Sequence, residues 1–87
     1  MTKKFLDNMQ LYHSSTCFFC VKVRAAMKRL GIKIKLKNIQ FGSKNKAELI
    51  RGGGKKQVPC LRIQENNEER WMYESDDIIE FLEQQCN

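Results

Sequence analysis

The sequence predicts an α/β fold in which a mixed four-stranded sheet is flanked by helices. Apolar residues alternate with polar ones in some stretches, as in strands, and recur at helical spacing in others. Turn-forming and capping residues separate these stretches, and the expected order is strand, helix, strand, helix, strand, strand, helix. The chain has 87 residues, the size of one domain, which we expect to span residues 1–87.

The first half of the chain is predicted to form a strand, a helix and a second strand. Residues 9–12 are a short apolar run, and Thr16 after it is expected to cap a helix that begins near Cys17. Gly31 is expected to end this helix, and residues 32–39 then alternate apolar residues with lysine, as in a strand with one buried face. The apolar stripe of the helix is formed by Cys20, Val23, Met27 and Leu30. A helix between two strands implies that the strands pair in parallel.

The second half is predicted to add a short helix, a β-hairpin and a final helix. The expected ranges are 43–51 for the helix, then 58–64 and 70–73 for the two strands of the hairpin. The three glycines at 52–54 are expected to end the short helix and open a flexible loop. Ser75 is expected to cap the last helix, with Asp76 and Asp77 in its first turn, where the helix dipole favours negative charge.

The charged residues are unevenly distributed along the chain. The formal net charge is +6; fifteen of the sixteen basic residues precede position 63, and eight of the ten acidic residues follow position 64. A basic half can attract nucleic acid or a membrane surface, but lysines on one strand face without interleaved aromatic residues support neither. No apolar run approaches the length of a membrane span, and the N-terminus lacks the apolar stretch of a secretory signal. We therefore expect a cytoplasmic protein that binds neither nucleic acid nor membrane. We also expect a monomer, an expectation that does not rest on these observations.

Cys17 and Cys20 are the clearest candidates for chemistry. A disulfide across two intervening residues closes a loop too small to stabilise a fold appreciably, so the pair indicates redox or metal chemistry. The thiolate is the reactive form of cysteine, and a helix N-terminus favours negative charge. We expect Cys17 to attack a disulfide and Cys20 to resolve the mixed disulfide that forms.

A zinc site is the competing interpretation of these cysteines. Such a site needs four ligands, usually supplied as two close pairs. The remaining candidates are His13, Cys60 and Cys86, which form no second close pair in the sequence. We therefore expect no metal at Cys17 and Cys20.

Val58 and Pro59 form a second candidate site just before a predicted strand. Proline is the residue that readily adopts a cis peptide bond, and together with the nearby cysteine pair we expect a cis bond here. Such a bond would expose the backbone of Val58 for pairing with an extended peptide substrate.

These motifs together resemble the glutaredoxin family, which has the thioredoxin fold. The resemblance runs from about residue 9 to residue 84 and rests on Cys17-Phe18-Phe19-Cys20, Gln57-Val58-Pro59 and Tyr73-Glu74-Ser75-Asp76. It implies a glutathione-dependent thiol–disulfide oxidoreductase that reduces glutathione mixed disulfides and protein disulfides. Its partners would be glutathione, as reductant, and disulfide-containing proteins. The catalytic residues would be Cys17 and Cys20.

The resemblance also implies a set of glutathione-binding residues. Phe19 would line the groove, Gln57 would contact the glycine carboxylate, and the backbone at Val58 and Pro59 would pair with the cysteinyl part. The γ-glutamyl end would be held by Ser75 and Asp76. A helix N-terminus is suited to binding a carboxylate, and an aspartate can pair with an ammonium group.

The chain departs from the family pattern in three respects. The Glu74-Ser75 pair also resembles the N-terminal domain of glutathione transferases, and the other two departures are single residues. Phe18 occupies the place where a proline usually follows the first cysteine, and Ser14 stands where a lysine is common. Some glutaredoxins that lack the motif proline bind a shared iron–sulfur cluster. The alternative function is therefore a module in which Cys17 and glutathione ligate such a cluster.

Overall fold

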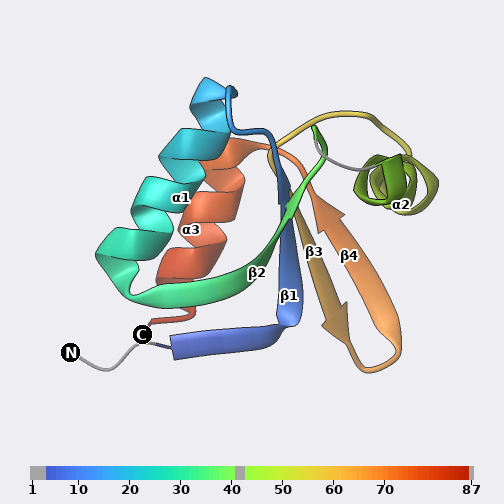
Figure 1. Cartoon of the computed structure of the whole chain (residues 1–87). Coiled ribbons are helices and arrows are strands. Elements are labelled where there is room, and N and C mark those ends of the chain that lie inside the picture. Colours follow the sequence, from blue (N-terminus) through green and yellow to red (C-terminus); the bar gives the residue numbers. More distant parts are fainter. Residues whose placement is uncertain (1–3, 41–42, 87) are drawn as a thin grey trace.

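The computed structural model describes residues 4–40 and 43–86 (Figure 1). Its elements follow the predicted order of strands and helices. They are β1 (Lys4–His13), α1 (Phe18–Leu30), β2 (Ile32–Asn38), α2 (Ser43–Gly53), β3 (Cys60–Glu65), β4 (Glu68–Met72) and α3 (Ser75–Gln84). This arrangement confirms the predicted α/β, thioredoxin-like fold with a mixed four-stranded sheet.

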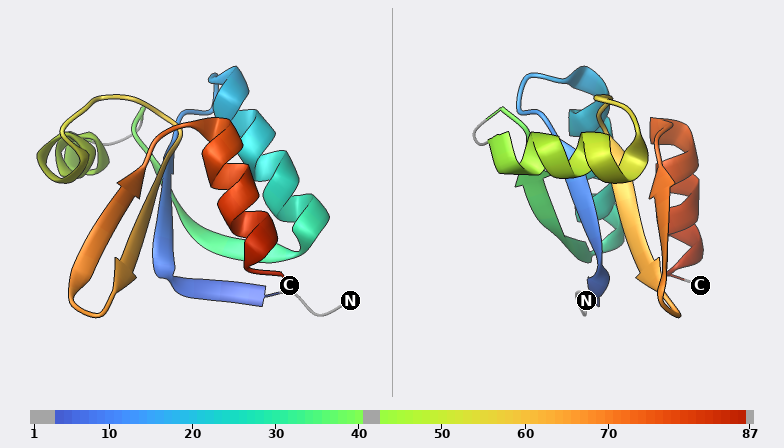
Figure 2. Two further views of the ribbon diagram at one scale, coloured as in Figure 1. Left: turned by 180° about the vertical axis from the view of Figure 1, so that it is seen from behind. Right: turned by 90° about the vertical axis from the view of Figure 1, so that its right-hand side faces the viewer.

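The strands are arranged in the order β2-β1-β3-β4. β1 pairs in parallel with β2 and antiparallel with β3, and β4 completes the sheet as the antiparallel partner of β3. α1 and α3 lie side by side on one face of the sheet, and α2 crosses the other face (Figures 1 and 2). The sheet is therefore covered on both faces, which is why β1 is apolar at consecutive positions.

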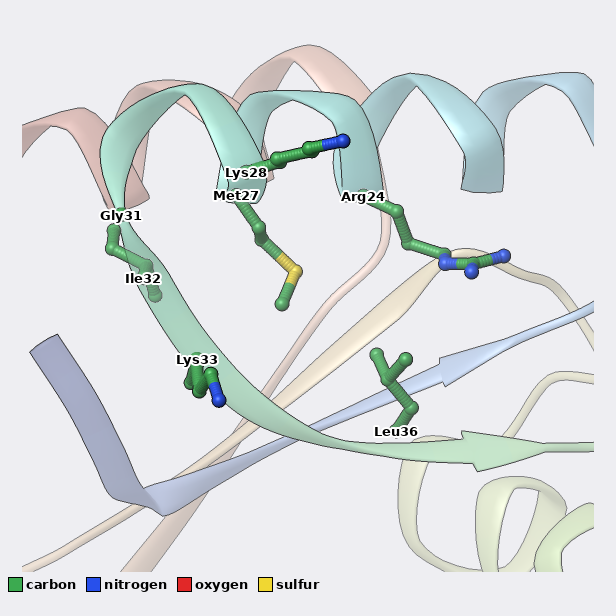
Figure 3. Close-up of a pocket in the computed structure, with 7 residues that line it drawn as sticks. All are labelled: Arg24, Met27, Lys28, Gly31, Ile32, Lys33 and Leu36. Atoms are coloured by element: carbon green, nitrogen blue, oxygen red, sulfur yellow. The ribbon is translucent and has the colours of Figure 1, made fainter. Parts of the chain in front are cut away.

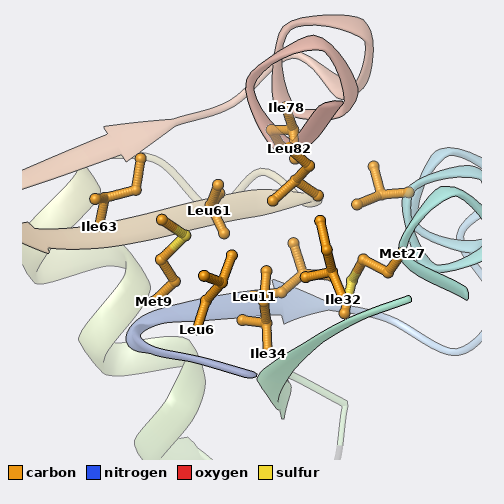
Figure 4. Close-up of a cluster of buried hydrophobic side chains, with 11 residues drawn as sticks. Leu6, Met9, Leu11, Met27, Ile32, Ile34, Leu61, Ile63, Ile78 and Leu82 are labelled. Carbon is orange, nitrogen blue, oxygen red and sulfur yellow. The ribbon is translucent and has the colours of Figure 1, made fainter. Parts of the chain in front are cut away.

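The two faces of β1 contribute to two separate apolar clusters. Leu11 faces α1 and α3, whereas the adjacent Tyr12 faces α2, and both are fully buried. Figure 4 shows the larger cluster, between the sheet and the helix pair. Its members are Leu6, Met9, Leu11, Val23, Met27, Ile32, Ile34, Leu61, Ile63, Ile78 and Leu82. Among the described residues, no helix has the length and apolar character needed to cross a membrane.

The caps of α1 and α3 differ from the prediction by one residue each. Cys17, rather than Thr16, is the N-cap of α1, and its thiol accepts the hydrogen bond from the Cys20 backbone amide at 3.4 Å. Glu74, rather than Ser75, is the N-cap of α3, and its side chain makes no capping hydrogen bond. The predicted end of α1 is confirmed, because Gly31 adopts a left-handed conformation with φ of 70°.

α2 is longer than predicted, since Gly52 and Gly53 form its last turn instead of a loop. The reason is a close approach between the helix and β4. A Cβ atom at Gly52 would overlap the indole of Trp71, and one at Gly53 would overlap the phenol of Tyr73. These glycines therefore bring α2 against the two aromatic residues, whereas Gly54, with φ of 84°, ends the helix.

Candidate active site

Cys17 lies at the point where the chain passes from β1 into α1. Its backbone is extended, and its half-buried side chain points back over the first turn of the helix. The thiol receives the Cys20 amide hydrogen bond on one side and lies 3.8 Å from the Val58 carbonyl oxygen on the other. The N-terminal position thus places a partly accessible sulfur between the Cys20 backbone amide and the Val58 carbonyl oxygen.

Cys20 has a different environment although it is only three residues away. Its side chain is fully buried, and burial raises the pKa of its thiol to about 12. A hydrogen bond to Cys17 also raises this pKa, whereas the hydrogen bond from the Ser14 amide, at 3.4 Å, lowers it. Cys20 is therefore held as a neutral thiol near pH 7, in contact with Cys17.

The Val58–Pro59 peptide bond is cis, as expected. The bond precedes β3 and lies opposite the start of α1, and it forms one wall of a pocket of about 150 Å³. This volume is below the roughly 300 Å³ typical of sites that enclose a whole drug-sized ligand. The pocket can therefore hold part of a peptide-sized molecule, with the rest lying on the surface. Its lining residues are Phe19, Gln57, Val58, Pro59, Tyr73, Glu74 and Ser75.

Five of the six residues expected to bind glutathione line this pocket, although they come from separate segments of the chain. The sixth, Asp76, is absent from the lining. Its carboxylate instead forms an ion pair with Lys22 of α1, at 2.7 Å. Both side chains are well exposed, so this pair is weak and can exchange for another partner.

Two lining residues, Tyr73 and Glu74, are not among the predicted site residues. Tyr73 packs against α2, as a residue of the hairpin would, but it also borders the pocket and donates a hydrogen bond from its hydroxyl to the Lys55 carbonyl oxygen at 3.3 Å. Glu74 adds a carboxylate to the rim. The sequence signal that could have identified them is their position directly before Ser75 and Asp76, because the end of a strand and the start of the next helix lie close together in space.

Phe18 and Phe19 are both exposed at the tip of α1. Phe18 is 75% exposed and Phe19 is 55% exposed, and the two rings meet edge to face with centroids 5.7 Å apart. Only Phe19 contributes to the pocket. The two aromatic residues of the motif thus have different positions, one on the pocket wall and one outside it.

The remaining candidate ligands lie in separate places. Cys60 is fully buried, and burial raises the pKa of its thiol to about 12, while Cys86 is exposed near the end of α3. His13 is buried at the end of β1, and its Nδ1 has no hydrogen-bond partner within the part of the chain that the structure describes. In that same part, no group of three or more histidine, cysteine or acidic residues is arranged to hold a metal ion.

Solved structures with the same fold include an isomerase and glutaredoxins. Maleylacetoacetate isomerase from Anaeromyxobacter dehalogenans 2CP-1, solved with GSH bound in its active site, aligns with a TM-score of 0.69 and 18% identity. The alignment covers 91% of this chain but 38% of the isomerase, so the chain spans less than two fifths of that protein. The glutaredoxin from Methanosarcina mazei Go1 has a TM-score of 0.65, 20% identity and coverage of 94% of this chain and 84% of its own. Glutaredoxin grx-1 from Archaeoglobus fulgidus has a TM-score of 0.63, 18% identity and coverage of 88% and 87%.

The sequence comparison gives a family but no individual relative. A comparison with curated protein sequences yields no significant match. Residues 11–87 match the family described as glutathione S-transferase, N-terminal domain. This range includes Cys17 and Cys20, the Val58–Pro59 bond and the start of α3. The chain therefore belongs to the glutathione S-transferase N-terminal domain family, within the group of thioredoxin folds that also contains the glutaredoxins.

Proposed function

We propose that the protein is a glutathione-dependent thiol–disulfide oxidoreductase that uses Cys17 as its nucleophile. The observation that carries the proposal is the position of the Cys17 sulfur, which is partly accessible at a helix N-terminus and faces the Val58 carbonyl beside the pocket. Family membership supports glutathione as the co-substrate, because the matched family is that of the glutathione S-transferase N-terminal domain.

The reaction begins with thiol–disulfide exchange. The Cys17 thiolate attacks one sulfur of the substrate disulfide, the substrate S–S bond breaks, and the departing sulfur leaves with the electron pair and takes a proton. Cys17 is then joined to the other half of the substrate. With a glutathione mixed disulfide, that half is the glutathionyl group, and the pocket next to Cys17 would receive its peptide part.

The second step needs a thiol that releases Cys17. Cys20 is in contact with Cys17 but is buried and protonated, whereas the thiol of a second glutathione arrives from solvent. Formation of the mixed disulfide removes the charge and hydrogen-bond acceptor on Cys17, which contribute to the raised pKa of Cys20, but burial remains the largest cause. We therefore propose that glutathione resolves glutathione mixed disulfides and is itself converted to oxidised glutathione. We propose that Cys20 resolves the mixed disulfides that protein substrates form with Cys17.

The pocket residues have distinct proposed roles in holding glutathione. The exposed ring of Phe19 supports the peptide, and the backbone of Val58 pairs with the cysteinyl unit. Gln57 contacts the glycine carboxylate, and the N-terminus of α3 at Ser75 receives the γ-glutamyl carboxylate. The γ-glutamyl ammonium would replace the Lys22 ammonium as the partner of Asp76.

The test is an assay with hydroxyethyl disulfide, glutathione and glutathione reductase, which follows NADPH consumption. Cys17→Ser is expected to lower the rate at least about a hundredfold, because a hydroxyl does not replace the thiolate. Cys86→Ser is the matched control, since Cys86 is exposed and distant in sequence, and it is expected to keep the parent rate. Full activity of Cys17→Ser would contradict the proposed nucleophile.

A second variant distinguishes the two resolving thiols. Cys20→Ser is expected to keep most of the activity on glutathione mixed disulfides and to lose most of the activity on a protein disulfide. Equal loss on both substrates would contradict the division of roles between glutathione and Cys20. We propose the cytoplasm as the compartment, since the reaction requires a supply of reduced glutathione.

A further inference from the structure

A second pocket lies on the other side of α1, between this helix and the edge strand β2 (Figure 3). This α1–β2 groove has a volume of about 240 Å³ and shares no lining residue with the pocket beside Cys17. Its floor is apolar and its rim is basic. The floor consists of Met27, Ile32 and Leu36, and the rim of Arg24, Lys28 and Lys33.

Leu36 is the residue that makes the floor unusual. It continues the alternation of Ile32 and Ile34, which are buried, yet it is 42% exposed. In Figure 3 its side chain points from β2 toward α1, and the thioether of Met27 points down toward the strand. Apolar surface thus remains uncovered inside a concave site, which is where ligands commonly bind.

Within the part of the chain that the structure describes, the rim residues have no carboxylate partner, a property that they share with Lys35 of β2 but not with the other three cations of α1 and β2. Lys22 pairs with Asp76, Arg29 pairs with Glu83, and Lys37 pairs with Glu48. Within residues 4–40 and 43–86, no ion pair is formed by Arg24, Lys28 or Lys33. Arg24, Lys28 and Lys33 therefore line the groove without an ion-pair partner among the described residues.

We propose that the α1–β2 groove binds a small free carboxylate with an apolar chain, such as a medium-chain fatty acid. The apolar chain covers the exposed side of Leu36 and the small parts of Met27 and Ile32 that line the groove, while the carboxylate pairs with the cations of the rim. The volume is below the roughly 300 Å³ typical of pockets for drug-sized molecules, so the occupant is short. A recessed site favours one free molecule over the flat surface of a membrane.

The direct test is a titration with sodium octanoate below its micelle concentration, followed by amide chemical shifts in the uniformly labelled protein. Shifts are expected at residues 31–36 and in the last turns of α1. Across hexanoate, heptanoate and octanoate, each added methylene is expected to tighten binding up to about fourfold. Octanol and octyltrimethylammonium are expected to bind at least about tenfold more weakly. Equal binding of octyltrimethylammonium, or shifts confined to the Cys17 pocket, would overturn the proposal.

Two matched pairs of variants test the floor and the rim. Leu36→Ser is expected to weaken octanoate binding about tenfold, whereas Ile50→Ser, at a residue of α2 that is 44% exposed, is expected to leave it unchanged. Lys28→Gln is expected to weaken binding about twofold to fivefold, and Arg29→Gln, outside the groove, to have no effect. Equal effects within either pair would contradict the assignment.

Two further measurements distinguish the groove from the Cys17 site and from a membrane-binding surface. Cys17→Ser is expected to bind octanoate as the parent does, so the failure of the proposed redox function would leave this proposal standing. Phosphatidylglycerol vesicles supply the alternative partner, an anionic membrane. Binding to these vesicles without binding of octanoate would replace the free carboxylate with a lipid surface and overturn the proposal.

Discussion

The two cysteines of the motif differ in accessibility although they lie one helical turn apart. Cys17 is half-buried at the start of α1, whereas Cys20 is fully buried and the pKa of its thiol is raised to about 12. Cys20 belongs to the buried stripe of α1 together with Val23 and Met27, and this position removes its thiol from solvent.

This difference predicts which thiols react in the native protein. With iodoacetamide at pH 8, Cys17 and Cys86 are expected to be alkylated, because both are accessible. Cys20 and Cys60 are expected to resist, because both are buried and have thiols with pKa values of about 12. Mass spectrometry of tryptic peptides measures each site, and labelling in urea provides the control in which all four react. Alkylation of Cys20 as fast as Cys86 would contradict the buried environment.

His13 makes stability depend on pH. Burial lowers the pKa of His13, and the nearby charge of Arg24 lowers it further. Below about pH 6.5 the unfolded chain then binds a proton that the folded protein resists, so stability is lost as pH falls through this value. The loss can reach about 1.4 kcal/mol per pH unit for one group. Above this range the contribution is fully present.

The substitution His13→Gln tests this dependence, because glutamine does not titrate. Urea unfolding of the parent is expected to show a stability that declines between about pH 7.5 and pH 5.5, and the variant is expected to show a flatter profile. Glu48 and Glu69 have lowered pKa values and titrate at lower pH, outside this window. Parallel profiles for parent and variant would show that His13 does not cause the decline.

At the scale of elements, the positions of strands and helices follow from the sequence better than their ends do. The strand at residues 32–38 and the stripe in α1 depend on local periodicity, and both elements are confirmed. The buried face of the strand, however, ends at Ile34, since Leu36 is 42% exposed. The caps depend on the backbone angles of single residues. Cys17 caps α1 with an extended backbone and a thiol that accepts the Cys20 amide hydrogen bond, whereas the residues generally preferred at this position are Ser, Thr, Asp and Asn.

The glycines of α2 could not be interpreted from the sequence because their reason lies in β4. Glycine in a helix costs about 1 kcal/mol relative to alanine, so three in a row predict the end of a helix. Here the indole of Trp71 occupies the space that a side chain on Gly52 would need. A contact between residues far apart in the chain therefore overrides a local preference.

The contact between Gly52 and Trp71 predicts a substitution whose effect on stability changes sign with the residue at position 71. Gly52→Ala is expected to destabilise the parent by about 1–3 kcal/mol through overpacking against Trp71, despite the better helix propensity of alanine. In a Trp71→Leu background the same change is expected to stabilise by up to about 1 kcal/mol, because the obstructing ring is gone. Urea unfolding of the four proteins measures the coupling. The same effect in both backgrounds would contradict the close packing.

At the scale of the whole molecule, the sequence predicts the layers but not the assembled site. Parallel pairing around α1 and an antiparallel hairpin were expected, and both are present. The pairing of β1 with β3 joins residues far apart in the chain, such as Met9 and Ile63, so no local pattern encodes it. This pairing brings Pro59 opposite Cys17. The family resemblance identified most of the pocket, whereas Tyr73 and Glu74, although part of the motif that carries it, were given no role at the site until the fold placed them in the lining.

The uneven charge distribution also has a counterpart in the packing of the helices. Basic residues of α1 meet acidic residues of α3 in the pairs Lys22–Asp76 and Arg29–Glu83. Each pair is exposed and individually weak. Together they show that α1, from the basic first part of the chain, lies against α3, from the acidic last part. The sheet that these two helices cover joins the same two parts of the chain through the pairing of β1 with β3.

Cleavage after Gly54, an exposed residue that follows α2, would divide the chain into two peptides of opposite net charge. A peptide of residues 1–54 has twelve basic and two acidic residues, and a peptide of residues 55–87 has four and eight, giving net charges of +10 and −4. We expect the separate peptides to associate and recover the circular dichroism spectrum of the intact chain. Their association should weaken between about 10 mM and 300 mM salt, because screening shortens the range of the attraction. Association that does not depend on salt would show that the apolar core alone holds the two peptides together. Association that does depend on salt would make the pair of peptides a reporter whose assembly is controlled by charge.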